Sequence, residues 1–168
     1  NDDVVAPGTG FDTHPHRDME IVTWVLRGSL VHQDSTGHAG VIYPGLAQRM
    51  SAGTGILHSE KNDSWRLAGD RHTDPVHFVQ MWVVPDTESI DPGYEQVDIN
   101  AQLDAGGLQP IASGQGHDAA ISIRQRDAVL WGGRLGVDEV VEVPDGQHVH
   151  LFVARGTVDL EAAGTLLE

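Results

Sequence analysis

The stretch GFDTHPHRDMEIVTWVLRG, residues 10–28, places two histidines one residue apart directly before a strongly apolar segment. Residues i and i+2 of an extended strand point to the same face, so His14 and His16 can present their imidazole rings side by side. Further along, ILHSEKN puts His58 and Glu60 in the same relation. If these two strands face each other across a barrel, three imidazoles and one carboxylate surround one point.

Such a ligand set suits a divalent transition metal rather than Ca or Mg, which prefer shells made of oxygen alone. The sequence contains no cysteine, so any metal must be held by nitrogen and oxygen. Four protein ligands on an octahedral ion leave two positions open, which a purely structural site avoids. A lone His-x-His pair in a strand is usually structural. The second pair of matching type, after a glycine-rich turn, is what favours a metal site.

The rest of the chain predicts an all-β fold. Turn residues are dense, with 20 Gly and 8 Pro. Between them lie short apolar runs, namely EIVTWVL, SLVH, GVIY, VHFVQMWVV, AISIRQ, AVLWGG, VVEV, HVHLFVA and TVDL. Many short strands at roughly even spacing, with almost nothing at helical period, predict an antiparallel sandwich or barrel. QRMSAGTG and PDTESIDPGYEQ are expected to be loops, because they are rich in residues that favour turns.

A weak internal repeat predicts two barrels in tandem. THPHRDMEIVTWVLRGSLVH and GQHVHLFVARGTVDLEA share a His-x-His pair, an apolar strand, an Arg-Gly turn and another strand. We expect a metal-binding barrel over residues 1–105 and a second barrel over residues 106–168, joined through the polar stretch at 100–110. No His-x-Glu pair follows His148 and His150, so the second barrel is expected to be metal-free. Both ends are expected to be truncated, and the second barrel incomplete.

Composition excludes several classes of function. Asp and Glu number 25 against 10 Lys and Arg, a formal charge of -15, which opposes binding to a phosphate backbone. No direct nucleic-acid partner is expected. No run of about 18 apolar residues could span a membrane, and no leader sequence is visible, so we expect a cytoplasmic protein. P-loop, Gly-x-Ser-x-Gly and His-Glu-x-x-His motifs are absent from the sequence.

Two groups of residues resemble the paired motifs of the cupin superfamily. The first group is Gly10, His14, Pro15, His16, Glu20 and Gly28, and the second is Gly55, His58 and Asn62. More narrowly, the chain from FDTHPHRDME to ILHSEKN, followed by PVHFVQMWVVPDTESIDPGYEQ, resembles the pirin family, bacterial members included. The resemblance is dense from about residue 3 to residue 98. It implies a bicupin fold.

The same resemblance implies a metal, usually iron, held by His14, His16, His58 and Glu60. Fe(II) is therefore expected first, with Ni, Cu, Mn, Zn and Co as the other candidates. Bacterial pirins resemble quercetin 2,3-dioxygenases, which implies opening of a flavonol ring by O2 on a metal that the flavonol chelates. Glu60 is the expected general base for the substrate hydroxyl. Two alternatives stay open, a metal-responsive regulator that binds a protein partner and a cupin enzyme acting on another small molecule.

Residues around the ligands are assigned by strand parity. Glu20 is a ligand in many other cupins but is not expected to bind directly in pirins. Because it shares the parity of His16, we expect it beside the ligands. Val22, Trp24 and Leu26 share that parity, so they are expected either to line the cavity above the metal or to pack in the core.

Other polar residues carry weaker signals. Gln80 alternates with two aromatic residues and could lie in core or pocket, where it would need a hydrogen-bond partner. A bulge at Arg17-Asp18 would keep the Asp18 carboxylate away from the metal. The remaining histidines have no ligand partner at useful spacing and are expected to be exposed or hydrogen-bonded: His32, His38, His72, His77 and His117.

Overall fold

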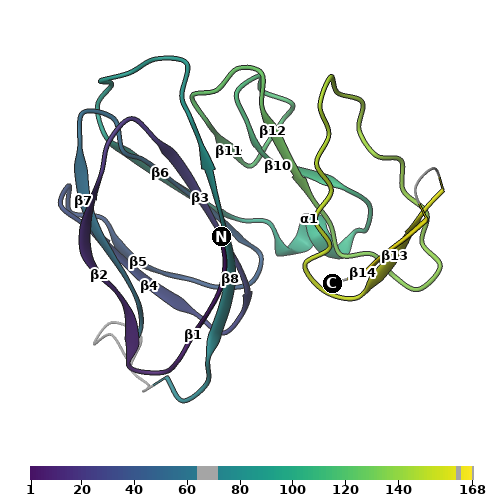
Figure 1. Ribbon diagram of the computed structural model, residues 1–168, viewed down its shortest axis with the longest axis horizontal. Coiled ribbons are helices and arrows are strands. Elements are labelled where there is room, and N and C mark those ends of the chain that lie inside the picture. The colour runs from purple at the N-terminus through teal and green to yellow at the C-terminus, as the bar shows by residue number, and fades with distance from the viewer. Residues whose placement is uncertain (64–71, 162–163, 168) are drawn as a thin grey trace. The chain divides into compact units, whose positions relative to one another are not determined.

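The computed structural model describes residues 1–63, 72–161 and 164–167 (Figure 1). Its contacts divide the chain into two units, residues 1–137 and 138–168. The all-β expectation is confirmed, since in the described residues helix is confined to the short α1 (Asn100–Asp104). No helix among the described residues is long and apolar enough to cross a membrane.

Among its described residues, the first unit has twelve strands, which Figure 1 labels. They are β1 (Asp2–Val5), β2 (Thr9–His16), β3 (Glu20–Arg27), β4 (Leu30–Asp34), β5 (Ala39–Ile42), β6 (Leu46–Ser51), β7 (Ile56–Asn62), β8 (Val76–Val83), β9 (Gly93–Asp98), β10 (Gln109–Ser113), β11 (Ile121–Ser122) and β12 (Val129–Gly132). In the second unit, β13 (Thr157–Leu160) pairs antiparallel with β14 (Gly164–Leu167).

Two antiparallel sheets enclose the interior of the first unit. One has the order β1-β8-β3-β6-β9 and the other the order β2-β7-β4-β5. Apolar side chains from both sheets form two separate clusters, one around Phe78 and Leu30 and one around Ile21 and Ile56. On β3 the inward side chains run from Ile21 to Val25 with Thr23 between them. The interior therefore has apolar ends and a polar middle, and the site lies in that middle.

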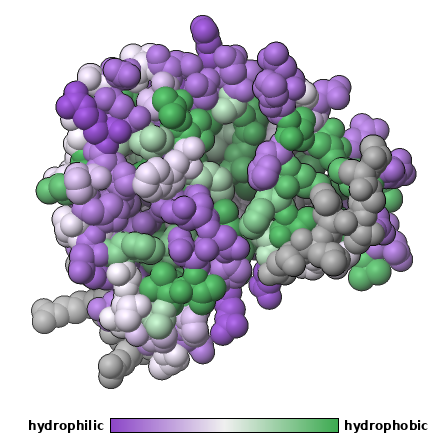
Figure 2. Space-filling model, in the orientation of Figure 1, coloured by the Kyte–Doolittle hydropathy of each residue, from purple (hydrophilic) through white to green (hydrophobic). Residues whose placement is uncertain are grey.

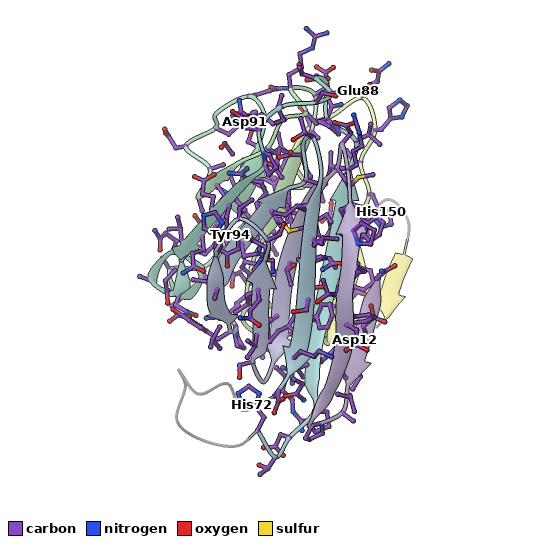
Figure 3. The ribbon with its side chains drawn as sticks, turned by 90° about the vertical axis from the view of Figure 1, so that its left-hand side faces the viewer. Asp12, His72, Glu88, Asp91, Tyr94 and His150 are labelled. Atoms are coloured by element: carbon purple, nitrogen blue, oxygen red, sulfur yellow. The ribbon has the colours of Figure 1, made fainter. Side chains whose placement is uncertain are left out.

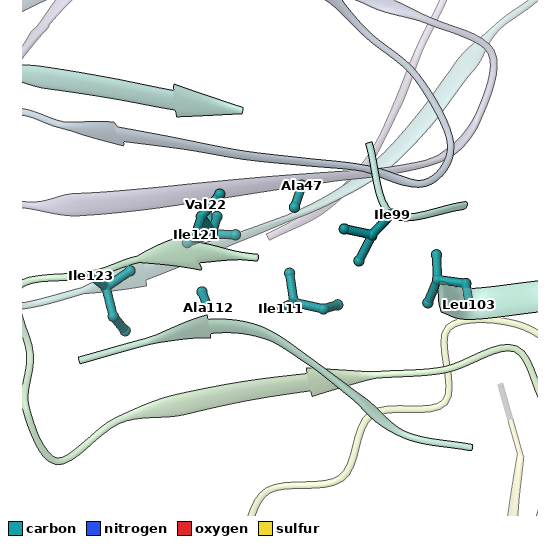
Figure 4. Packing of buried hydrophobic residues seen from close by; sticks show 8 residues of the cluster. All are labelled: Val22, Ala47, Ile99, Leu103, Ile111, Ala112, Ile121 and Ile123. Carbon is teal, nitrogen blue, oxygen red and sulfur yellow. The ribbon is translucent and has the colours of Figure 1, made fainter. Parts of the chain in front are cut away.

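The larger sheet is covered on its outer face as well. There a third sheet, of order β11-β10-β12, packs against β3 and β6. The apolar cluster between them, drawn in Figure 4, consists of Val22, Ala47, Ile99, Leu103, Ile111, Ala112, Ile121 and Ile123. Burial on both faces explains why EIVTWVL is almost continuously apolar instead of alternating.

This packing decides for the core between the two alternatives left open for Val22 and Trp24. Val22 belongs to the outer cluster and Trp24 packs against it, while Leu26 falls at a register shift between β3 and β8. The parity argument fails because β2 ends at His16 and β3, which begins at Glu20, belongs to the other sheet. A parity counted along β2 cannot be carried into β3.

Two segments expected to be loops contain strands. Residues 48–51 of QRMSAGTG belong to β6, and residues 93–96 of PDTESIDPGYEQ belong to β9. The two strands pair with each other, with Gln48 opposite Gln96. Polar side chains interrupt the apolar pattern of these strands, although β6 is buried along its whole length. Within it Arg49 donates to Ser51 and to Glu95.

Two expected strands are not formed in the described residues. VVEV at 140–143 and HVHLFVA at 148–154 have no strand pairing, and several of their apolar side chains are exposed, including Val140, Val149 and Phe152. A strand without a hydrogen-bonded neighbour is not stable in water. The second barrel over residues 106–168 stays a prediction.

The face seen in Figure 2 carries many hydrophilic residues, with apolar patches among them. This agrees with the sequence, in which acidic residues exceed basic ones and the formal charge is -15.

Candidate metal site

The expected ligands lie on two neighbouring strands. β2 pairs antiparallel with β7, and His14 lies directly opposite His58. The ligands therefore do not meet across the barrel, because the two strands are hydrogen-bonded neighbours in one sheet. Nε2 of His14 lies 3.0 Å from Nε2 of His58, and the centroid of the His16 ring lies 4.9 Å from the centroids of both.

A glycine and a bulge make this close pairing possible. At Gly10 a Cβ atom would lie 2.3 Å from the carbonyl oxygen of Glu60, so no other residue fits without moving a strand. The register then shifts between Phe11 and His14. The extra residue of the bulge places the side chains of Phe11 and His14, which are three positions apart, on the same face of β2.

Glu60 is 3% exposed, and its carboxylate faces the larger sheet. The Gln80 side-chain amide donates to both of its oxygens, at 2.9 and 3.0 Å. Trp82 Nε1 donates to Gln80 Oε1 at 2.9 Å, and the Trp82 ring meets the His16 ring edge-on at 4.9 Å between centroids. Gln80 is therefore part of the site, and a chain of contacts links the carboxylate to an imidazole.

His32 is the residue that sequence reasoning missed. It lies opposite Glu60 in the pairing of β4 with β7 and is 1% exposed. The ring of Tyr94 from β9, labelled in Figure 3, lies 5.1 Å from it between centroids. Ligand atoms of His32, His58 and Glu60 lie within 4.8 Å of one another, as do those of His14, His16 and His58. His58 thus belongs to both groups. Of the four predicted ligands, His14 and His16 belong to one group and Glu60 belongs to the other.

The interior favours neutral imidazoles. Burial lowers the pKa of His58 to about 3, with smaller contributions from His14, His32 and His16. Burial, followed by His14, also lowers the pKa of His16. Burial raises the pKa of Glu60, partly offset by the hydrogen bond from Gln80. Unprotonated ring nitrogens keep the lone pairs that a metal needs.

The donor atoms fit a bound metal ion. Nδ1 of His14 lies 2.7 Å from the backbone oxygen of Asp12, which accepts its proton, so in the neutral tautomer the lone pair is on Nε2. At metal–nitrogen distances of about 2.1 Å, adjacent ligands at right angles have nitrogens about 3.0 Å apart, which is the Nε2–Nε2 distance of His14 and His58. Nε2 of His16 is buried without a hydrogen-bond partner. A cation would satisfy all three nitrogens.

Glu20 does not lie beside the ligands, which corrects the expectation from parity. Its Oε2 accepts hydrogen bonds from Ser51 Oγ at 2.9 Å and from the Arg124 backbone N–H at 3.2 Å. These contacts lie on the outer face of the larger sheet. The chain leaves the strand at Asp18, whose φ is 46°. This break, between β2 and β3, keeps the Asp18 carboxylate off the interior face.

Four of the other histidines make hydrogen bonds outside the ligand groups, as expected. Their partners are Thr36 for His38, Ser29 and Asn62 for His72, Asp2 for His77, and Ser113 for His117. An open cavity of about 430 Å³ borders the site, and His16, Pro15, Ile56 and Leu57 are among its lining residues.

The chain is similar to a known protein family and to several named bacterial proteins. The family model described as Pirin matches residues 1–83. A Mycobacterium tuberculosis protein, provisionally named quercetin 2,3-dioxygenase, is 57% identical over 169 residues, which are 100% of this chain and 66% of that protein. The quercetin 2,3-dioxygenase of Escherichia coli K12 is 40% identical over 162 residues, 95% of this chain and 65% of that protein.

Solved structures agree with this. YhhW from Escherichia coli matches with a TM-score of 0.65 and 42% identity, covering 74% of this chain and 49% of that chain. The same bacterial pirin in complex with nickel(II) matches with a TM-score of 0.63 and 40% identity. The chain thus spans up to 66% of the length of these relatives and about half of the solved chains.

Proposed function

Because this chain belongs to the pirin family, we propose that its barrel binds one divalent transition metal through His14, His16, His58 and Glu60 and opens a flavonol ring with O2. The observation that carries the proposal is the convergence of three imidazoles, two of them with Nε2 atoms 3.0 Å apart, in a chain 40% identical to a quercetin 2,3-dioxygenase. Fe(II) is the first candidate metal, and the nickel(II) complex of YhhW makes Ni(II) the second.

When bound, the metal supplies Lewis-acid and redox chemistry and a template for two adjacent flavonol oxygens. The imidazoles hold it from one side of the barrel. Glu60 accepts the proton of the substrate hydroxyl, a role that suits a carboxylate whose pKa burial raises. Gln80 orients that carboxylate, and the open cavity beside His16 offers apolar contacts to the flavonol rings through Pro15, Ile56 and Leu57.

Metal content and flavonol turnover test the proposal together. Chain prepared without metal is loaded with Fe(II) or Ni(II), and we expect one ion per chain by elemental analysis. Quercetin absorbance and dissolved oxygen should then fall in parallel. His14→Ala should lose both metal and turnover. His77→Ala, a matched variant whose histidine pairs with Asp2 outside the site, should keep both.

The possible results separate the proposals. A chain that binds no metal would overturn the site itself. One metal per chain without quercetin loss above the His14→Ala background would overturn the flavonol substrate and favour a metal-responsive regulator.

A further inference from the structure

Two of the proposed ligands differ in how their second ring nitrogen is satisfied. Nδ1 of His14 has the backbone oxygen of Asp12 at 2.7 Å. Nδ1 of His58 is buried and has no hydrogen-bond partner. If Nε2 of His58 binds a metal, Nδ1 must carry the proton, and a buried N–H without an acceptor is costly. The structure must supply an acceptor for this proton.

His32 is the group placed to accept it. Its ring lies 5.4 Å from the His58 ring between centroids, tilted by 51°, and its own Nδ1 is likewise buried without a partner. A ring nitrogen lies about 1.1 Å from the imidazole centre, so a linear hydrogen bond of about 3.0 Å gives centroids about 5.2 Å apart. The observed separation of 5.4 Å is close to this value, and the hydrogen bond requires the rings to turn their Nδ1 atoms toward each other.

The tautomer of His32 follows from Asp34. Oδ2 of Asp34 lies 3.4 Å from Nε2 of His32. Oδ1 of the same carboxylate accepts from the backbone N–H groups of Thr36 and His38 and from the Thr36 hydroxyl, so the group acts as an acceptor throughout. Nε2 of His32 therefore carries the proton, which leaves Nδ1 with a lone pair toward His58.

We propose that Asp34 and His32 form a relay of hydrogen bonds that positions His58 for metal binding. The order is Asp34 carboxylate, His32 imidazole, His58 imidazole, metal, so the relay extends the carboxylate–histidine–metal arrangement by one ring. It fixes the tautomer of His58, aims Nε2 at the ion and increases its basicity. The inference rests on the proposed function, because it requires a metal at His58.

Two variants interrupt the relay at different points. His32→Phe keeps a ring and removes the acceptor. Asp34→Asn keeps Oδ1 for the turn and can place an amide N–H against Nε2 of His32, which forces the His32 proton onto Nδ1, against His58. Both should weaken Co(II) and Ni(II) affinity, measured by competition with a chelator, by about 10- to 100-fold.

The matched control is His38→Ala. His38 lies 3.3 Å from the same Asp34 oxygen but stands outside the relay, so this variant should keep wild-type affinity. Nitrogen-15 spectra of the zinc-loaded wild-type chain should show His58 protonated at Nδ1 and His32 protonated at Nε2, a signature that mere packing would not produce.

The outcomes distinguish this inference from its premise. Wild-type chain that takes up no metal overturns the proposed function. Wild-type binding with unchanged affinity in both variants overturns the relay alone. Spectra with the His32 proton on Nδ1, or with Nδ1 of His32 bound to zinc, also overturn it, and they remain informative if either variant fails to fold.

Discussion

The carboxylate of Glu60 depends on one neighbour, because both of its oxygens accept from the side-chain amide of Gln80. Gln80→Leu removes this donor and leaves a buried charge poorly solvated. We expect a loss of about 1–3 kcal/mol in the free energy of unfolding of the metal-free chain. Metal affinity should fall as well, since the pKa of Glu60, already raised by burial, rises further and favours the neutral acid. Urea unfolding and chelator competition measure the two effects.

Trp82→Phe weakens the same Gln80–Glu60 interaction indirectly. This variant keeps a ring against His16 and loses only the N–H that holds Gln80 Oε1. Its effects should have the same sign as those of Gln80→Leu and be smaller. A larger loss of metal affinity in Trp82→Phe than in Gln80→Leu would contradict the view that Trp82 acts through Gln80.

At the scale of elements, the approach of β2 to β7 fixes the site. Gly10→Ala introduces a Cβ where the carbonyl oxygen of Glu60 lies. The strands must separate, and the distance between His14 and His58 should grow. We expect a loss of about 1–3 kcal/mol in unfolding free energy, as in overpacked sites, together with substoichiometric metal. Gly37→Ala is the control, because the structure leaves open space there although its φ is also positive, 99° against 154° at Gly10. Backbone strain without the clash should leave metal stoichiometry intact.

The elements also show what could be read from the sequence. The apolar runs of β3 and β8 predict strands directly. The residue pairs on β2 and β7 are local in the sequence, so a spacing of two residues was enough to predict that His58 and Glu60 share a face. The sequence does not show which strands pair with each other or which sheet each strand joins. Which sheet β3 joins decides where Glu20 points, and the pairing of β4 with β7 brings His32 to the site; neither depends on local spacing.

At the scale of the whole molecule, a metal that binds the folded site must stabilise the fold. Binding to the folded state alone adds about 2.7 kcal/mol at a free metal concentration 100 times Kd. Thermal unfolding should therefore shift upward with added Ni(II), and the shift should be absent in His14→Ala. Equal shifts in both chains would mean that the metal binds elsewhere.

Protonation of histidines in the unfolded state should destabilise the metal-free chain as the pH falls. Burial lowers the pKa of His16, His32 and His58, the last from 6.5 to about 3, so below pH 6.5 the unfolded chain binds more protons than the folded one. Stability contributed by the neutral rings is complete above this pH and is lost as pH falls toward 3. Glu60, whose pKa burial raises, acts in the opposite direction and makes the decline shallower. Urea unfolding between about pH 7.5 and pH 4.5 should show this decline. His58→Gln should flatten it, and a decline equally steep in that variant would place the responsible protons elsewhere.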